Sequence, residues 1–372
     1  MRIKDFGVEI WMNTYENYCK YNLAETCVES LTVDELLQMS GRKDQLLDEI
    51  LDMKLTYGDI EGSLSLRTNV ANLYEKAIAQ NVTITHGGIN ANALSILTLV
   101  EPGDRVISVL PTYQQLYSIP ESIGAEVKIL RLREENSFLP DLNELKSYVN
   151  DNTKLICLNN PNNPTGSLME EGFLKEIVEI ARSCDAYILC DEVYRGLTHE
   201  GNNFTVSIAD LYEKGISTGS MSKVYSLAGL RLGWVVGPEE FIERVNRQRD
   251  YHIISVGMIN DRLATIALEN KDKILNRNLS IVRQNKKILD EWIAQEARIS
   301  YVEPKAGTTA LLKIDVPMKS DEFCIKLQND KGVMLLPGSA LEMEGYVRIG
   351  YCNNTQILIK GLEELSLFLK EI

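Results

Sequence analysis

Lys223 is the residue whose setting points most directly to covalent chemistry. It ends the run Ser220-Met221-Ser222-Lys223, and Arg231 follows shortly after. A lysine amine can form an imine with an aldehyde cofactor, and hydroxyl and guanidinium groups beside it can bind a phosphate. Most lysines are only solvated surface charges, so this stretch alone leaves both interpretations open. Residues that follow other strand-like runs are needed to decide between them.

Asp191 follows an apolar run that ends at Cys190, and Tyr194 comes shortly after it. A carboxylate directly after a buried strand needs a cation or strong hydrogen-bond donors. A pyridinium N–H is such a partner, and a protonated ring nitrogen makes the ring an electron sink. Tyr194 would then donate to the phenolate oxygen of that ring. These groups favour pyridoxal phosphate as the cofactor, and the alternative is that Asp191 only caps a helix.

Residues 159–166, with the sequence Asn-Asn-Pro-Asn-Asn-Pro-Thr-Gly, form a strongly restricted loop. Two Asn-Pro pairs and a glycine force an extended, tightly turned path that fixes the asparagine side chains. A loop with a purely structural role rarely needs that much restriction. We therefore expect Asn163 to donate to the phenolate oxygen of the cofactor.

Two other strand ends carry weaker signals. Gly87, Gly88 and Ile89 lie between the run 82–85 and a helix, where backbone N–H groups can approach a phosphate. A plain tight turn is the more common reason for such a glycine pair. Tyr113 follows another run and could stack on a pyridine ring. Taken by itself, Tyr113 is better explained as a tyrosine at a domain rim.

The elements that position these residues alternate along the chain. From residue 82, short β-rich runs alternate with helical stretches, which predicts an α/β fold with a mostly parallel sheet flanked by helices. Ligands bind beyond the carboxyl ends of such strands, where the residues above lie. The expected strands are Val82–Thr85, Arg105–Leu110, Glu126–Leu132, Lys154–Asn159, Ala186–Asp191, Ile216–Gly219 and Gly233–Val236.

We expect three regions along the chain. Residues 1–45 form an N-terminal arm and part of a small domain, with a helix capped by Thr32. Residues 46–270 form the large cofactor-binding domain, and residues 271–372 form a smaller α+β domain. The patterns in this last part of the chain predict a charged helical region ending near Trp292, strands over 310–314 and 347–351, and helices from Ser320 and over 356–369.

The composition narrows the functional class. The chain has 372 residues, of which 44% are hydrophobic and 25% charged, and a formal net charge of -14. Nucleic acid and anionic membranes attract positive surfaces, so neither is an expected partner. The 7 cysteines show no close metal-ligand pairing, and no metal is expected. They are typical of reduced thiols in a cytoplasmic protein, and no membrane span or export signal is indicated.

Together these motifs resemble those of the fold type I, class I/II pyridoxal-phosphate-dependent aminotransferases. They are the Gly-Gly turn, Pro-x-Tyr, Asn-Pro-Asn-Asn-Pro-Thr-Gly, Asp-Glu-Val-Tyr, Ser-x-Ser-Lys and Gly-Leu-Arg-Leu-Gly, in that order over nearly the whole chain. The resemblance implies that Lys223 forms the internal aldimine and then moves the α-proton. It implies that Asp191 pairs with the pyridine nitrogen, Asn163 and Tyr194 with O3′, and that Tyr113 stacks on the ring. The implied phosphate ligands are Gly87, Gly88, Ile89, Ser220, Ser222 and Arg231.

Two further positions follow the family pattern. Tyr57 resembles the tyrosine that reaches the phosphate of the neighbouring subunit, which implies a homodimer with shared active sites. Arg348 resembles the arginine that binds the substrate α-carboxylate beside Asn163, where a planar fork suits a carboxylate. Without the resemblance, Arg348 would be taken as an exposed strand arginine. Residues 22–28 depart from the glycine-bearing loop of many members, and no second arginine for a dicarboxylic substrate is evident.

The resemblance implies transfer of the amino group of an L-amino acid to a 2-oxo acid by a ping-pong route. A β-eliminating carbon–sulfur lyase and a replacement and cyclisation enzyme similar to capreomycidine synthase would use the same residues. A non-catalytic sensor, similar to the aminotransferase-like half of certain bacterial transcription regulators, fits the acidic charge poorly. A generic nucleotide-binding protein is disfavoured because the glycine turn lacks the spaced Gly-x-Gly-x-x-Gly pattern.

Overall fold

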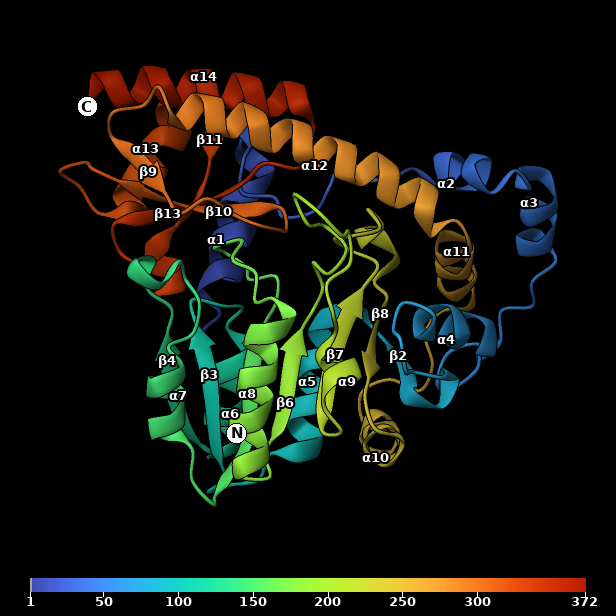
Figure 1. Cartoon of the computed structure of the whole chain (residues 1–372). Coiled ribbons are helices and arrows are strands. Elements are labelled where there is room, and N and C mark those ends of the chain that lie inside the picture. The colour runs from blue at the N-terminus through green and yellow to red at the C-terminus, as the bar shows by residue number, and fades with distance from the viewer. Residues whose placement is uncertain (1) are drawn as a thin grey trace.

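The structure is a computed structural model that describes residues 2–372. A seven-stranded sheet forms the lower half of the molecule (Figure 1). β8 runs antiparallel to both of its neighbours, and the other strand pairs are parallel. The mostly parallel sheet predicted from the sequence is therefore confirmed, and every predicted strand end lies within one residue of the observed end. The order across the sheet is β2 (Val82–Thr85), β8 (Gly233–Val236), β7 (Gly215–Ser220), β6 (Tyr187–Asp191), β5 (Thr153–Asn159), β3 (Arg105–Leu110) and β4 (Glu126–Arg131).

Helices cover both faces of this sheet (Figure 1). One face carries α5 (Gly87–Leu99), α6 (Gln115–Ile123) and α10 (Glu239–Arg249), and the other carries α7 (Leu142–Tyr148), α8 (Glu171–Ser183) and α9 (Ile208–Leu211). Burial on two sides explains why the central strands are continuously apolar. In β5, Ile156 and Leu158 join one hydrophobic cluster, whereas Leu155 and Cys157 join the other.

A second, antiparallel sheet lies above the carboxyl ends of the large sheet (Figure 1). The strands predicted over 310–314 and 347–351 belong to this sheet, and the helices predicted from Ser320 and over 356–369 are also present. The order across this sheet is β12 (Leu336–Pro337), β13 (Tyr346–Gly350), β10 (Thr309–Ile314) and β9 (Ile299–Tyr301). α11 (Met258–Glu269) precedes the C-terminal part of the chain, whose helices are α12 (Lys271–Ile293), α13 (Ser320–Lys331) and α14 (Thr355–Glu371).

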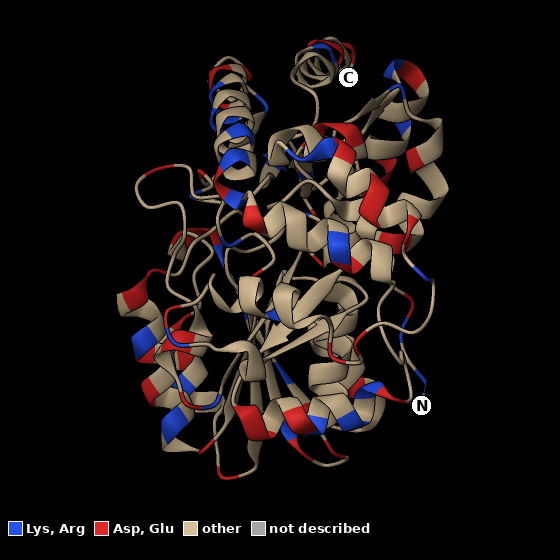
Figure 2. Cartoon of the chain, turned by 90° about the vertical axis from the view of Figure 1, so that its right-hand side faces the viewer, with Lys and Arg blue, Asp and Glu red and all other residues tan. Residues whose placement is uncertain are grey.

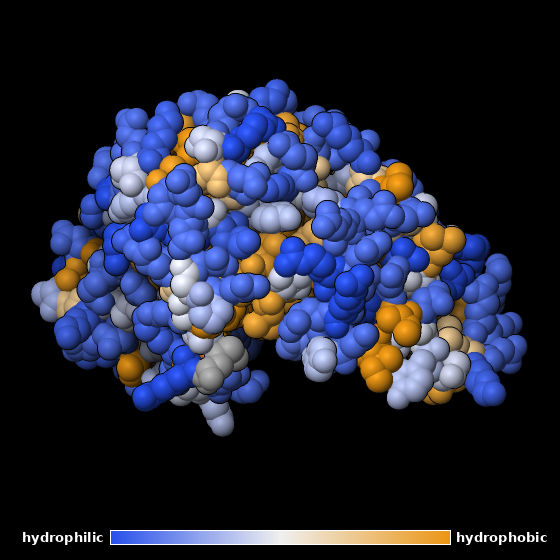
Figure 3. Space-filling view, turned by 90° about the horizontal axis from the view of Figure 1, so that it is seen from below, coloured by the Kyte–Doolittle hydropathy of each residue, from blue (hydrophilic) through white to orange (hydrophobic). Residues whose placement is uncertain are grey.

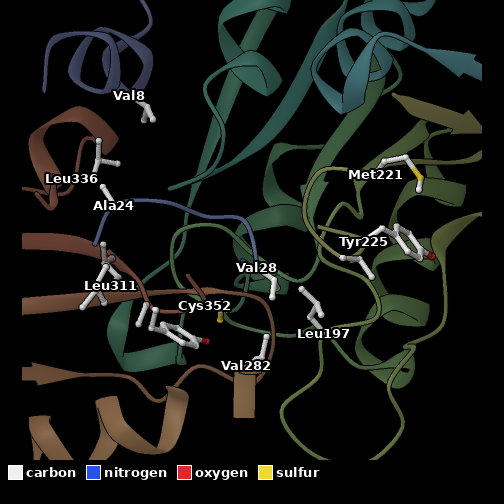
Figure 4. Close-up of a cluster of buried hydrophobic side chains, with 14 of the residues drawn as sticks. Val8, Ala24, Val28, Leu197, Met221, Tyr225, Val282, Leu311, Leu336 and Cys352 are labelled. Carbon is white, nitrogen blue, oxygen red and sulfur yellow. The ribbon is translucent and has the colours of Figure 1, made fainter. Parts of the chain in front are cut away.

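The N-terminal segment is tied to the second sheet and its helices. β1 (Tyr21–Asn22) pairs in parallel with β11 (Val333–Met334), and the indole of Trp11 in α1 (Gly7–Tyr15) donates to the Leu335 carbonyl at 2.9 Å. Figure 4 shows Val8, Ala24 and Val28 within a hydrophobic cluster that also holds Leu311 and Leu336. This packing places residues 22–28 directly above the strand ends of the large sheet.

A smaller lobe follows this segment and projects to the right in Figure 1. It contains α2 (Val33–Ser40), α3 (Lys43–Leu51) and α4 (Leu64–Ala71). Thr32 caps α2 as predicted, because its side chain accepts from the Glu35 backbone while Glu35 accepts from the Thr32 backbone. Figure 2 shows acidic and basic residues interspersed along the outer helices of the molecule.

Candidate active site

A cavity of about 330 Å³ lies between the carboxyl ends of the large sheet, the N-terminal segment and β13. Most of the functional residues predicted from the sequence line it, although they come from widely separated parts of the chain. The predicted residues found in its wall are Gly88, Ile89, Tyr113, Asn163, Asp191, Tyr194, Ser220, Ser222, Lys223, Arg231 and Arg348.

Asp191 ends β6 and places a buried carboxylate in the wall of this cavity. Asn92 donates to its Oδ2 at 2.8 Å and the Val193 backbone N–H donates to its Oδ1 at 3.2 Å. Burial raises the pKa of Asp191, against the effect of these donors and of the Lys223 charge. No helix begins at Asp191, so the helix-cap alternative is wrong. A cationic ring nitrogen in the cavity would favour the ionised carboxylate.

The N-terminus of α5 meets Arg231 and two serine hydroxyls at one end of the cavity. Gly87 has φ +74, a conformation that favours glycine, and a Cβ on it would lie 3.0 Å from Arg231 Nη2, so the guanidinium lies close to the start of the helix. Ser220 and Ser222 are both buried in the cavity wall. A helix N-terminus, a guanidinium and hydroxyl donors form a set that suits a phosphate.

Lys223 follows β7 and extends toward the N-terminal segment. Its Nζ donates to Thr26 Oγ1 at 2.6 Å and lies 3.4 Å from Cys27 Sγ. Burial alone would lower the pKa of Lys223, but Cys27, Tyr194 and Glu25 outweigh burial and raise it. Lys223 forms no surface ion pair within the described residues, and its amine faces the same cavity as Asp191. The surface-lysine interpretation is therefore wrong.

Asn163, Tyr194 and Tyr113 complete the central part of the wall. Asn163 is held in the restricted loop by its backbone N–H, which donates to Asn159 Oδ1 at 2.6 Å. Tyr194 is buried, and burial raises the pKa of its hydroxyl. Tyr113 donates its hydroxyl to Glu9 Oε1 at 2.7 Å, so its ring lies against the N-terminal helix as well as the cavity.

Arg348 lies on β13 with 3% of its surface exposed, so it is not an exposed strand arginine. Its Nη1 donates to Asn163 Oδ1 at 3.3 Å and its Nη2 to the Ala24 carbonyl at 2.9 Å. Its buried Nε has no hydrogen-bond partner among the described residues. Burial lowers the pKa of Arg348, and a carboxylate entering the cavity would stabilise the charged guanidinium.

Gly87 is not in the cavity wall, although it directly precedes Gly88, which is. Tyr57 lies apart from the cavity. It is 75% exposed in the connection between α3 and α4. An exposed position agrees with the expected turn, and its role toward a second subunit stays a prediction.

The cavity also contains residues that sequence reasoning did not identify. Asn92 lies one turn after Gly88 on α5, and that helical spacing could have indicated that it faces the strand ends. Glu9, Met12 and Glu16 come from the N-terminal helix and the turn that follows it. Their sequence setting carries no signal, because only the packing of α1 against the second sheet brings them to the cavity.

These residues fit a phosphorylated pyridine aldehyde. The buried carboxylate of Asp191 suits a ring N–H, the α5 end suits a phosphate, and Lys223 offers an amine between them. Within residues 2–372 no group of three histidine, cysteine or acidic side chains is arranged to hold a metal ion. Over the same residues, no helix combines the length and apolar character needed to cross a membrane.

Comparison with known proteins agrees with this geometry. The family model for aminotransferase class I and II matches residues 40–362. Capreomycidine synthase of Streptomyces vinaceus is 29% identical over 364 residues, which cover 96% of this chain and 92% of that protein. An aspartate aminotransferase of Pyrococcus horikoshii is 31% identical over 315 residues, covering 82% of this chain and 81% of that protein. A crystal structure of a PLP-dependent aminotransferase from Streptococcus suis 89-1591 has a TM-score of 0.97 and 43% identity, covering 100% of this chain and 99% of that one.

Proposed function

Because the chain belongs to the class I and II aminotransferase family, whose cofactor is pyridoxal phosphate, we propose that it moves the amino group of an L-amino acid to a 2-oxo acid. The observation that carries this proposal is that Lys223 and Asp191 line one cavity, beside a group of donors suited to a phosphate. An amine and a carboxylate placed in this way can serve the two ends of one cofactor ring.

When bound, pyridoxal phosphate supplies an aldehyde that condenses with amines and a ring that accepts electrons from the substrate α-carbon. Asp191 would keep the ring nitrogen protonated, and Asn92 holds the Asp191 carboxylate in place. Asn163 and Tyr194 would donate to the phenolate oxygen, and Tyr113 would stack on the ring. The phosphate would be held by the first N–H groups of α5 together with Ser220, Ser222 and Arg231, which line the cavity or adjoin it.

Lys223 would be the group that takes the proton from the substrate α-carbon and delivers it to C4′, the carbon of the cofactor that carried the aldehyde. Thr26 orients its amine through the contact of 2.6 Å. Arg348 binds the α-carboxylate through its unpartnered Nε and one Nη, while Asn163 and the Ala24 carbonyl fix the plane of the guanidinium. Two parallel hydrogen bonds from the planar guanidinium would fix the substrate carboxylate, and this keeps the α-carbon within reach of Lys223.

We propose further that two copies of the chain form a dimer in which Tyr57 of one copy completes the phosphate site of the other. Support comes from an apolar surface around Tyr57, with exposed fractions of 81% for Leu51, 75% for Leu55, 53% for Ile60 and 61% for Leu64. In Figure 3 apolar atoms appear on the lobe at the right, the side on which α3 and α4 lie in Figure 1. Large exposed apolar surfaces of this kind mark interaction sites.

Mixed dimers test the shared site. We expect Tyr57→Phe alone to weaken cofactor binding severalfold, as the loss of one hydrogen bond does. In a mixed dimer of Tyr57→Phe and Lys223→Ala copies, the site that retains Lys223 takes its tyrosine from the Lys223→Ala copy. That site should therefore bind the cofactor as tightly as the wild type. Weak binding there, or a monomer in light-scattering measurements, would contradict the shared site.

A second candidate is the replacement and cyclisation chemistry named above. It is favoured by the likeness to a capreomycidine synthase over 96% of this chain. Elimination, replacement and transamination all begin with the same proton removal, so the residues in the cavity do not separate them.

The deciding experiment measures each half-reaction. Cofactor-loaded protein is mixed with single amino acids, and the visible absorbance of the cofactor is followed. We expect conversion to the amine form with one class of amino acid, and recovery of the aldehyde form after a 2-oxo acid is added. Ammonia, pyruvate or a cyclised product formed without an oxo acid would favour the second candidate and contradict transamination.

A further inference from the structure

Three carboxylates from the N-terminal segment face the cavity on the side that this segment forms. Glu9 lies on α1, Glu16 follows that helix, and Glu25 lies beyond β1. Val8 and Met12 of α1 line the same side. We call Glu9, Glu16 and Glu25 the carboxylate cluster. An aliphatic wall beside negative groups suits a chain with a positive end.

The carboxylate cluster is only partly satisfied by the protein. Glu9 accepts from the Tyr113 hydroxyl at 2.7 Å, and Glu25 accepts from the backbone N–H groups of Thr26 at 2.6 Å and Cys27 at 2.8 Å. Glu16 has one long contact, from Asn22 Nδ2 at 3.4 Å. In the part of the chain that the structure describes, none of the three carboxylates is within 4.0 Å of a lysine or arginine nitrogen.

Matching each charged side chain of the cavity with a group of the cofactor or substrate shows which side chains have no partner. Asp191 faces the ring nitrogen, Arg231 the phosphate and Arg348 the substrate α-carboxylate, if the proposed function holds. The buried, unpartnered Nε of Arg348 marks the end of the cavity that receives a carboxylate. Burial alone would raise the pKa of Glu25, but the Lys223 charge and backbone donors outweigh burial and lower it, so Glu25 already faces a cation. Glu9 and Glu16 form no ion pair with another described residue, and these two carboxylates are left without a matching cation. Burial raises the pKa of Glu16, and the nearby charges of Glu25 and Glu9 raise it further.

We infer that the amino donor carries a cationic side chain, an ammonium or a guanidinium, whose charged end lies among Glu9, Glu16 and Glu25. This inference rests on the proposed function and names its substrate class. The aliphatic part of the side chain lies along Val8 and Met12, and the α-carboxylate binds Arg348. A cation in this position relieves the mutual repulsion of the three carboxylates.

The same cluster acts against dicarboxylic donors. A second carboxylate on the substrate would meet like charges, and burying it there would leave it without a cation. Discrimination therefore comes from attraction for one class of side chain and from repulsion of another. Glu16 is the member with the weakest contacts inside the protein, so it is the one freest to bind the substrate.

The test compares matched donors in the cofactor half-reaction. Arginine is compared with citrulline, its neutral isostere, and lysine and ornithine with norleucine, while aspartate and glutamate form the anionic arm. We expect kcat/KM for the preferred cationic donor to exceed that of its neutral isostere by about 10- to 100-fold, the range of a charge-assisted hydrogen bond. Preference between arginine and the two amines distinguishes a guanidinium site from an ammonium site.

Glu16→Gln assigns the effect to the carboxylate cluster. We expect this variant to lose about tenfold in kcat/KM for the cationic donor while the neutral isostere is unchanged. Glu243→Gln, an exposed position on α10, is the matched control. Titration with α-methyl analogues, which have no α-hydrogen to lose, gives dissociation constants that are independent of turnover, and these should show the same loss.

The outcomes separate the two proposals. Equal kcat/KM for cationic and neutral donors, or a preference for aspartate, overturns the cationic site while leaving transamination intact. An equal loss for both donor classes in Glu16→Gln also overturns it, since that result indicates a purely structural role. Failure of every amino acid to convert the cofactor is the result that contradicts the proposed function itself.

Discussion

The two halves of the cavity are built in different ways. The cofactor half is formed by the ends of β6 and β7 and by the start of α5, all parts of one continuous sheet and its first helix. The substrate half is formed by the N-terminal segment and β13, which pack on the second sheet. The cofactor is constant within the family, so a rigid sheet edge can serve it, and we expect substrate choice to depend on elements outside that sheet.

The halves also differ in charge. The cofactor half offers Arg231, serine hydroxyls and a helix N-terminus to an anion. The substrate half presents one guanidinium, that of Arg348, and the three carboxylates of the carboxylate cluster. Lys223 lies at the boundary, because its backbone belongs to the large sheet region and its amine contacts Thr26 of the N-terminal segment. Substitutions on either side of this boundary should therefore have different kinetic consequences.

The largest effect is expected for Lys223→Ala, which removes the group shared by both halves. We expect transamination to fall by at least about a thousandfold, because an essential covalent and proton-transfer group is lost. Borohydride reduction followed by peptide mass analysis should show the cofactor fixed to the Lys223 peptide in the wild type only. Lys287→Ala on the exposed face of α12 is the control and should keep the wild-type rate. A Lys223→Ala protein with full turnover would exclude the covalent route.

The cofactor half could be predicted from the sequence because its residues directly follow strands. Asp191 comes right after an apolar run, and parallel strands bring their carboxyl ends to one edge, so its position follows from the strand pattern. Asn92 was missed, although it supports Asp191, because its partner lies far away in the chain.

The substrate half could be predicted only at Arg348 and Asn163, which the family resemblance implied. Glu9, Glu16 and Glu25 were not identified as site residues, because acidic residues in a terminal helix and in the turns and loops after it are usually solvated. Their place in the cavity depends on tertiary contacts, such as the bond from the Trp11 indole to Leu335 and the pairing of β1 with β11. Local sequence patterns do not encode such long-range packing.

Asp191→Asn should have the next largest effect and tests the cofactor half alone. An amide cannot neutralise a ring cation, so we expect kcat to fall about 100- to 1,000-fold, the range for breaking a buried ion pair. KM for the amino acid should change little. Glu192→Gln is the matched control, since the neighbouring buried carboxylate accepts from Ile208 and Ser217 outside the cavity. A large rise in KM with kcat unchanged would contradict the assignment of Asp191 to the cofactor.

Arg348→Lys tests the substrate half, and we expect it to have a smaller effect than Asp191→Asn. A lysine keeps the positive charge but loses the planar fork, so we expect kcat/KM for the amino donor to fall about 10- to 100-fold, mainly through KM. Cofactor affinity, measured by fluorescence, should stay at the wild-type value. Arg131→Lys on the exposed end of β4 serves as the control. If cofactor affinity fell with donor affinity, the division of the cavity into two halves would be wrong.

Thr26→Val should give the smallest effect and tests the boundary between the halves. The hydroxyl of Thr26 is the stronger of the two contacts to the Lys223 amine, at 2.6 Å against 3.4 Å for Cys27 Sγ. Valine keeps the shape and removes this acceptor, so we expect the rate of α-proton transfer to fall about 2- to 10-fold, in line with the loss of one hydrogen bond. We expect Cys27→Ala, in the same segment, to lower this rate less than Thr26→Val does, because sulfur is a weak acceptor. A kinetic isotope effect with α-deuterated donor should increase in Thr26→Val if proton transfer is the step that slows. Equal losses in the two variants, with the isotope effect unchanged, would show that the N-terminal segment supports only binding and takes no part in orienting the lysine.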